Sequence, residues 1–362
     1  MRPRGGHGDV PLPAAMETKV RNRLRGIILL AIFVALGTSL LSGIGSSSNA
    51  SGGLLLVANK GDKTLSIVDP DAGKELVAVP VGGTTGHEVA APSDGGTAWV
   101  PIYGNSGVGQ PGTDGRTISI IDLGSQKKVA EIDLGAPNRP HCAVFGPKDG
   151  KLYVTAELSR SVKVIDPASR TVVDSIPTGA AESHMLALSS DGKRAYTSNV
   201  GDGTVSAIDV DAKKVVAVIP VAKTAQRIAI SDDDRWVFTS DQTKPELVII
   251  DTQGNSVKTR VPLSALGFGV TPTHDGRYLL ITHPSTDSVS VLNLQTLEVD
   301  RVIRVPAHPQ EILVRPDDRV AYVSCDVSKK VAAIDLAIGK VEKLIDVGAG
   351  ADGLAWAPQA AR

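Results

Sequence analysis

Three of the seven histidines in this chain occupy one position of an internal repeat. When the repeats are aligned on the first turn of each, His87, His141 and His184 fall shortly before that turn, and Asp352 holds the same place in another copy. Imidazole and carboxylate groups are ligands that zinc, copper, manganese and iron take in proteins. If the repeats surround a common axis, these four side chains converge, and the sequence predicts a transition-metal site.

Two other interpretations of this repeat position stay open. The remaining copies carry Gln226, Phe268 and Gln310 there, so the position is polar in most repeats. It can form a polar ligand pocket without a metal, or it can line the mouth of a water-filled channel. Residues at this position, beside it or in adjoining loops complete the predicted ligand site: Gln226, Arg227, Gln310, Glu311, Tyr103, Asn199, Asp241 and His283.

Two carboxylates near the same position are candidates for catalysis. Glu88 follows His87, and Glu157 lies in a loop of the next repeat. Either could act as a general base, or could orient an imidazole bound to a metal. The sequence contains no nucleophile-elbow motif and no CxxCH haem-attachment motif. The sequence therefore assigns no reaction.

The elements that must position these side chains are short β-strands in a repeat of roughly 40 residues. The copy at 183–223 contains four strand signals separated by polar turns such as Asp191-Gly192, a pattern typical of antiparallel hairpins. The segment 54–81 lacks the first strand of the unit, and 350–358 is a first strand with nothing after it. Pairing these ends predicts an all-β, seven-bladed β-propeller of four-stranded antiparallel blades over residues 53–359.

The repeats also resemble those of the YVTN-type bacterial β-propeller family. Tyr153-Val154-Thr155 and Tyr322-Val323-Ser324 match the stretch that gives this family its name. An Ile-Asp pair ends the third strand in several copies, at Ile121-Asp122, Ile165-Asp166, Ile208-Asp209, Ile250-Asp251 and Ile334-Asp335. The resemblance covers nearly everything after residue 53 and implies an exported seven-bladed propeller, without implying a particular activity.

Composition narrows the classes of partner. The formal net charge is -1 and the isoelectric point is about 6.7, so no basic surface for nucleic acid is expected. Cys142 and Cys325 fall on blades nearly opposite each other, and no disulfide is expected between them. Cys142 is expected to pack between blades instead of joining the site.

Residues 1–52 precede the repeats and are predicted to carry an export signal. A basic stretch from Lys19 to Arg25 leads into the apolar run 26–44, which is followed by small residues up to Ala50. We expect cleavage after this run, although an uncleaved run of about 18 apolar residues can anchor a chain in a membrane. Translation can start at Met1 or Met16. Whether the segment is cleaved or remains as a membrane anchor, the repeats are expected outside the cytoplasm, either in the periplasm or secreted.

The insertion 104–115 lengthens one loop at the predicted mouth of the channel. Its glycines suit either a mobile lid or a tolerated surface insertion.

Three candidate functions follow from the whole pattern. The first is an exported protein that binds a small molecule or an extracytoplasmic protein. The second is a metal-dependent hydrolase, lactonase or copper oxidoreductase, and the third is a cell-surface interaction module. The chain is expected to be a monomer that meets the membrane only through its N-terminal segment.

Overall fold

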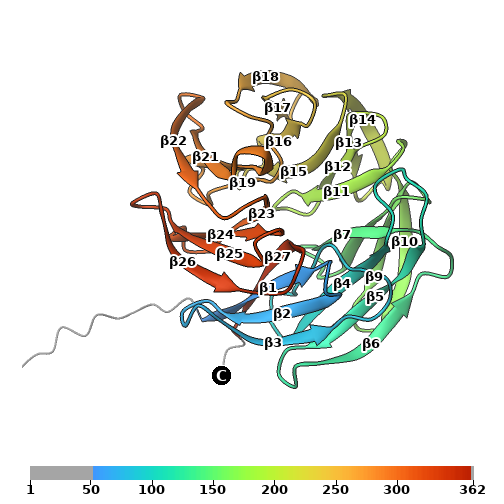
Figure 1. Cartoon of the computed structure of the whole chain (residues 1–362). Coiled ribbons are helices and arrows are strands. Elements are labelled where there is room, and N and C mark those ends of the chain that lie inside the picture. The colour runs from blue at the N-terminus through green and yellow to red at the C-terminus, as the bar shows by residue number, and fades with distance from the viewer. Residues whose placement is uncertain (1–51, 360–362) are drawn as a thin grey trace, which may run out of the picture. The chain divides into compact units, whose positions relative to one another are not determined.

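The computed structural model describes residues 52–359, which form seven antiparallel β-sheets arranged as the blades of a propeller (Figure 1). This confirms the predicted all-β, seven-bladed fold. Among the described residues one short 3₁₀ helix, η1 (Pro284–Thr286), accompanies the strands. The predicted export signal lies outside them. No helix in the described range has the length and hydropathy needed to cross a membrane.

The blades are numbered here along the chain, with strands given from the channel outward. Blade 1 contains β27 (Ala351–Pro358), β1 (Gly53–Asn59), β2 (Thr64–Asp69) and β3 (Lys74–Pro80). Blade 2 contains β4 (Thr97–Gly104), β5 (Asp114–Asp122) and β6 (Lys127–Asp133). Blade 3 contains β7 (Pro140–Phe145), β8 (Leu152–Ala156), β9 (Ser161–Asp166) and β10 (Thr171–Pro177).

The later blades follow the same order. Blade 4 contains β11 (Ser183–Leu188), β12 (Arg194–Asn199), β13 (Thr204–Asp209) and β14 (Lys214–Pro220). Blade 5 contains β15 (Ala225–Ile230), β16 (Trp236–Asp241), β17 (Glu246–Asp251) and β18 (Ser256–Pro262). Blade 6 contains β19 (Val270–Pro272), β20 (Tyr278–His283), β21 (Ser288–Asn293) and β22 (Glu298–Arg304). Blade 7 contains β23 (Pro309–Val314), β24 (Val320–Cys325), β25 (Lys330–Asp335) and β26 (Lys340–Asp346).

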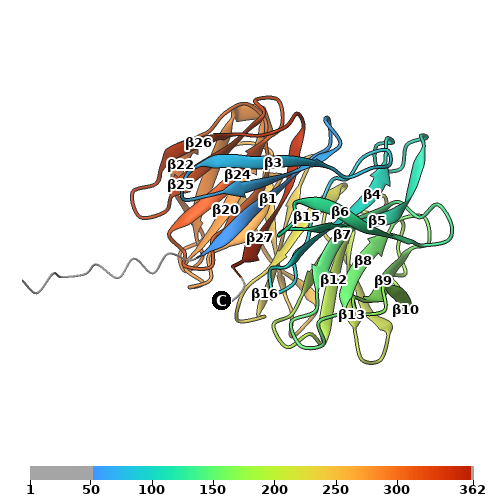
Figure 2. The same ribbon diagram turned by 90° about the horizontal axis from the view of Figure 1, so that it is seen from below.

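Blade 1 closes the ring, because its inner strand comes from the C-terminal end of the chain. β27 pairs antiparallel with β1 in a register that sets Leu54 against Ala357 and Leu56 against Ala355. The edge-on view shows β27 beside β1 (Figure 2). The predicted closure is therefore confirmed, and it gives both terminal strands hydrogen-bonding partners.

Blade 2 differs from the prediction of four strands in every blade. Its inner segment forms only isolated bridges to β4, at Gly86 and Ala90. Along β4 the amides of Trp99 and Tyr103 donate to this segment. The residue between them that faces the same way is Pro101, which has no N–H to donate. The regular ladder is therefore interrupted beside His87.

Five of the inner strands, β7, β11, β15, β23 and β27, have a β-bulge near the start of the strand. In β7 the pairing moves from Pro140–Ala156 to Ala143–Val154, which leaves one extra residue on the inner strand. Similar irregularities occur near the start of β11, β15, β23 and β27. A bulge breaks the strict alternation of side chains and redirects them locally. The inner strands lie around the centre in Figure 1, so these bulges determine what faces the channel.

Candidate functional site

The three predicted histidines form one cluster at the mouth of the channel, the end where the inner strands begin. The ring centroids of His87 and His141 lie 5.3 Å apart, and those of His141 and His184 lie 3.5 Å apart. Tyr103 of β4 adds its ring, 5.0 Å from His87 and 5.2 Å from His141. We call these four residues the aromatic cluster. Equivalent positions on neighbouring blades thus converge, as the repeat alignment predicted.

Burial keeps the imidazoles of the aromatic cluster neutral at neutral pH. Burial lowers the pKa of His87 to about 4, although Asp352 opposes the change. His141 and His184 are almost fully buried, and burial lowers the pKa of each. Nδ1 of His141 and Nδ1 of His184 have no hydrogen-bond partner. The cluster therefore holds buried polar atoms whose bonding capacity the protein does not use.

Asp352, the fourth predicted metal ligand, belongs to a separate ion cluster below the imidazoles. Its Oδ1 accepts a hydrogen bond from Arg227 at 2.8 Å, and its Oδ2 lies 3.2 Å from Nζ of Lys60. Arg227 also binds Glu88 at 2.5 Å and Glu311. We call Arg227, Glu88, Glu311 and Asp352 the Arg227 cluster. It joins blades 5, 2, 7 and 1 across the channel.

The carboxyl groups of the Arg227 cluster titrate differently from one another. Burial raises the pKa of Glu88 to about 8, and it also raises that of Glu311. Burial acts in the same direction on Asp352, but Arg227 and Lys60 outweigh it and lower the pKa of that carboxyl. Glu88 is thus protonated at neutral pH while Asp352 is charged, which reduces the repulsion among three acids around one guanidinium group.

No metal-holding arrangement is found in residues 52–359, where no group of three or more His, Cys, Asp or Glu side chains is placed to bind an ion. The physical reason is visible in the two clusters. Asp352 is engaged by Arg227 and Lys60, and the imidazoles of His141 and His184 stack on each other. The structure thus gathers the predicted imidazoles but separates them from the carboxylate by its ion pairs.

The second catalytic candidate, Glu157, binds Tyr103 and Arg139 at the mouth of the channel. Its carboxylate accepts hydrogen bonds from the hydroxyl of Tyr103 at 2.5 Å and from Arg139 at 2.9 Å. Burial opposes ionisation, yet hydrogen bonds from Tyr103 and Arg139, together with His184 whose Nδ1 lies 3.9 Å away, lower the pKa of Glu157 to about 2. A carboxylate held so strongly in its charged form is a poor proton acceptor at neutral pH. Its contacts fit a positioning role for the ring of Tyr103.

Arg139 fastens the inserted loop 105–113 to the mouth. Its guanidinium group donates to Oδ1 of Asp114 at 2.6 Å and to the carbonyl of Gln110 at 2.7 Å, in addition to Glu157. The neck of the loop requires glycine at Gly104, which has a φ of 124° and where a Cβ would lie 2.2 Å from the carbonyl oxygen of Thr113. The contacts favour a fastened wall of the site over a freely moving lid.

Replacing Arg139 with glutamine is expected to release this loop. The variant loses charged hydrogen bonds to Asp114 and Glu157, each worth roughly 1.5–3 kcal/mol. We expect faster proteolytic cleavage and faster amide hydrogen exchange within 105–113, measured by mass spectrometry. Arg116→Gln, which breaks an exposed pair with Asp133, is the matched control and should leave the loop protected. Equal protection in both variants would show that Arg139 does not hold the loop.

A cavity of about 340 Å³ opens beside His87, and we call it the mouth cavity. Its walls come from the β1–β2 loop, the inner segment of blade 2 and the inserted loop: Lys60, Gly61, Lys63, Thr84, Thr85, His87, Asn105, Ser106 and Gly107. Ser106 is 5% exposed, and its hydroxyl has no hydrogen-bond partner. A cavity of this size suits a small molecule.

Three residues of the predicted ligand site serve their own blades. The amide of Asn199 donates to Ser206 at 2.9 Å, and the carboxylate of Asp241 accepts from the amide of Thr243 at 2.7 Å. The imidazole of His283 bonds to Ser290 at 2.8 Å. All three side chains are buried. They end second strands, where a buried polar group needs partners within the sheet, and the structure places them in bonds within their blades and not on the walls of the mouth cavity.

The other predicted ligand residues lie nearer the clusters. The amide of Gln226 donates to Nε2 of His184 at 3.1 Å. Gln310 lies 3.0 Å from Nδ1 of His308. Arg227 and Glu311 belong to the Arg227 cluster, and Tyr103 belongs to the aromatic cluster. Gln226 therefore extends the aromatic cluster toward blade 5.

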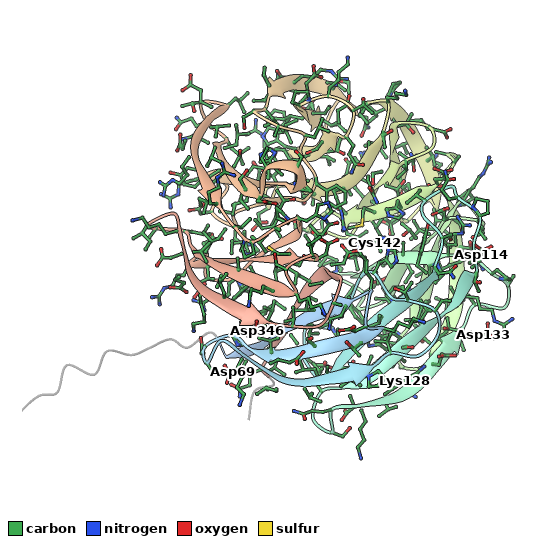
Figure 3. The ribbon with its side chains drawn as sticks, viewed as in Figure 1. Asp69, Asp114, Lys128, Asp133, Cys142 and Asp346 are labelled. Carbon is green, nitrogen blue, oxygen red and sulfur yellow. The ribbon has the colours of Figure 1, made fainter. Side chains whose placement is uncertain are left out.

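The cysteines behave as predicted, because Cys142 and Cys325 are free and buried. Cys142 packs with Met185 and Leu186 of the next blade, and it lies toward the centre of the ring while Asp69, Lys128 and other labelled charged residues lie at its rim (Figure 3). Lys60 and Ser106 were not predicted as site residues from the sequence. Lys60 follows Asn59, which ends the second strand of blade 1, so the same alignment of loops could have found it.

Comparisons with known proteins identified a matching family model and solved structures of similar fold. The family model described as "Cytochrome D1 heme domain" matches residues 149–356. A chain of hydrazine synthase from Kuenenia stuttgartiensis is 18% identical, with a TM-score of 0.68, over 83% of this chain and 100% of that chain. A functionally unknown protein from Desulfotomaculum acetoxidans DSM 771 is 15% identical, with a TM-score of 0.69, over 85% and 100%. No curated protein matches in sequence. At these identities the solved structures support the fold alone.

Proposed function

The chain belongs to the cytochrome D1 heme domain family, and on that premise we propose that it is an exported propeller that binds a small polar molecule at the mouth of its channel. The observation that carries the proposal is the meeting of the mouth cavity with the aromatic cluster at His87. There the cavity reaches the imidazole of His87, whose lowered pKa keeps it neutral, and Ser106 on another wall has a hydroxyl without a hydrogen-bond partner. The N-terminal signal in the sequence supports a location outside the cytoplasm.

The name of the family implies haem, but the residues at the mouth do not offer a haem slot. A tetrapyrrole needs a flat space beside the imidazole that binds its iron. His184, the mouth imidazole within the matched residues, is covered by the ring of His141 at 3.5 Å, and its Nε2 accepts from Gln226. Tyr103 lies 5.8 Å from the ring of His184. These contacts fill the space, and no step is assigned to a haem.

The geometry favours binding over catalysis. Glu157 is held in its charged form by its hydrogen-bond donors, and Glu88 is enclosed in the Arg227 cluster. In contrast, His87 is partly exposed and faces the mouth cavity. A neutral imidazole can both donate and accept a hydrogen bond, which suits recognition of a polar group. Thr84, Thr85 and Asn105 add further polar groups to the same walls.

The proposal predicts that one substitution abolishes ligand binding without unfolding the propeller. A small-molecule library is screened against the full chain by thermal shift, and hits are measured by calorimetry. We expect His87→Ala to weaken a hit at least about tenfold, since it removes the imidazole that meets the ligand. His274→Ala is the control, because His274 pairs with Asp232 in a turn at the opposite end of the channel.

Two results would contradict the proposal. The first is a library with no hit, or hits that His87→Ala leaves unchanged. The second is formation of a haem complex, seen as a new absorption band after haem is added, that disappears in His184→Ala. The second result would mean that the imidazole stack opens and that the family cofactor binds here.

A further inference from the structure

We propose that the ligand of the mouth cavity is a small organic anion, with a carboxylate or phosphate group held by Lys60, Lys63 and Ser106. This inference rests on the proposed function, and it adds the chemical class of the ligand. It is carried by two independent features of the cavity, the charge of its walls and an unused buried hydroxyl.

The walls of the mouth cavity carry cationic groups without a carboxylate among them. Lys60 and Lys63 both line the cavity, and no Asp or Glu does. Lys63 is exposed, and Lys60 is partly exposed, with its side chain 31% accessible. Nζ of Lys60 lies 3.2 Å from Oδ2 of Asp352 and 3.7 Å from Oδ2 of Asp326, and these carboxylates position it. The positive charge of Lys60 is thus partly balanced by carboxylate, whereas the positive charge of Lys63 is available to a ligand.

Ser106 supplies a hydrogen-bond donor that the protein leaves unused. Its side chain is nine-tenths buried or more, and its hydroxyl has no partner although it lines the cavity. A buried hydroxyl without a partner is unfavourable, so such a group points to a ligand or a water that completes it. An anionic oxygen accepts from a hydroxyl and from ammonium groups at once, which a neutral apolar ligand cannot do.

The inserted loop holds Ser106 in place before any ligand arrives. Oδ1 of the neighbouring Asn105 accepts from the amide of Thr113 at 2.7 Å, and this bond closes the neck of the loop. Arg139 binds the carbonyl of Gln110 further along the loop. A donor fixed in this way loses little conformational freedom on binding, which favours affinity.

Calorimetry on the full chain tests the anion against neutral compounds of the same shape. The probes are succinate, benzoate and glycerol 3-phosphate, beside succinamide, benzamide and glycerol. We expect at least one anion to bind, with its neutral counterpart at least about tenfold weaker, and binding to weaken as salt rises. The carboxylates and the phosphate ester distinguish the two sources of negative charge.

Variants separate recognition of the anion from folding. Ser106→Ala should weaken the anion several-fold while the unfolding temperature stays unchanged, because the hydroxyl has no protein partner to lose. Lys63→Gln should also weaken it, and Lys193→Gln, an exposed lysine at the opposite end of the channel, should not. Equal binding of the neutral probes, or unaltered affinity in both site variants, would overturn the anion inference and leave the proposed function standing. Absence of binding by every probe and every library compound would contradict the proposed function itself.

Discussion

Replacing Arg227 with methionine is expected to lower the free energy of unfolding by about 3–5 kcal/mol. The guanidinium group is 3% exposed and contacts Glu88, Glu311 and Asp352, so its loss leaves three acids buried around one point without their shared cation. It also removes a stacking contact with Phe268, whose ring centroid lies 5.0 Å away. Thermal unfolding followed by circular dichroism should show a midpoint lowered by about 10 °C.

Two further variants test whether stability is lost because the acids of the Arg227 cluster no longer have a cationic partner. Arg235→Met removes an exposed arginine of the same blade that stacks on Trp236, and it should cost less than about 1 kcal/mol. Adding Glu88→Gln and Glu311→Gln to Arg227→Met removes two of the three acids and should recover part of the lost stability. If the triple variant is no more stable than Arg227→Met alone, the unpaired carboxyl groups of Glu88 and Glu311 are not the reason for the loss.

The second large effect concerns pH. Between pH 6.5 and 8 the free energy of unfolding is expected to fall by about 2 kcal/mol as the pH rises, because folded Glu88 keeps a proton that the unfolded chain does not bind. Burial raises the pKa of Glu88 from 4.5 to about 8, so the folded chain holds a proton that the unfolded chain has already released. The stabilising contribution of Glu88 is therefore complete below its unfolded pKa and is lost as the pH rises toward and through its folded value.

The lower limit of this pH range, pH 6.5, is set by the histidines of the aromatic cluster. Below pH 6.5 the unfolded chain binds protons at imidazoles that stay neutral in the fold, such as His87 with its pKa of about 4. That effect lowers stability at acid pH and opposes the contribution of Glu88. Above pH 6.5 the contribution of Glu88 remains, over about 1.5 pH units at roughly 1.4 kcal/mol per unit.

Urea unfolding at a series of pH values checks this expectation. Glu88→Gln keeps the shape of the protonated side chain but cannot titrate, so its stability should stay flat between pH 6.5 and 8. Glu298→Gln, an exposed glutamate on β22, should keep the slope of the unsubstituted chain. A slope that survives in Glu88→Gln would assign the titration to another group of the Arg227 cluster, such as Glu311.

These results divide the channel into two tiers with different roles. The Arg227 cluster connects four blades, and its member Asp352 lies on β27, which closes the ring by pairing with β1 on the channel side of blade 1. The aromatic cluster lies at the mouth, and its His87 lines the mouth cavity, where a ligand can reach it. Asp352 connects the tiers, because it binds Arg227 on one side and Lys60 on the other. Substitutions in the lower tier should therefore change stability first.

The sequence by itself determined the repeat, and the repeat determined the fold. Each blade copy carries its own turn and strand signals, so the four-strand unit and the closure by 54–81 and 350–358 could be predicted from local chemistry. The convergence of His87, His141 and His184 also followed, because equivalent positions in a ring of blades face one axis. The sequence did not predict that blade 2 lacks a regular inner strand, because the interruption of its ladder depends on the direction in which Pro101 faces.

Only the tertiary structure decided which side chains pair across the channel. Arg227 is separated from Glu88 by 139 positions and from Asp352 by 125, and no repeat rule relates their chemistry. Register shifts occur near Asp352 in β27 and near Arg227 in β15, and Asp352 pairs with Arg227 and Lys60. The predicted four-residue metal site thus separated into an aromatic cluster and an ion cluster, because buried charges take the nearest partner of opposite sign.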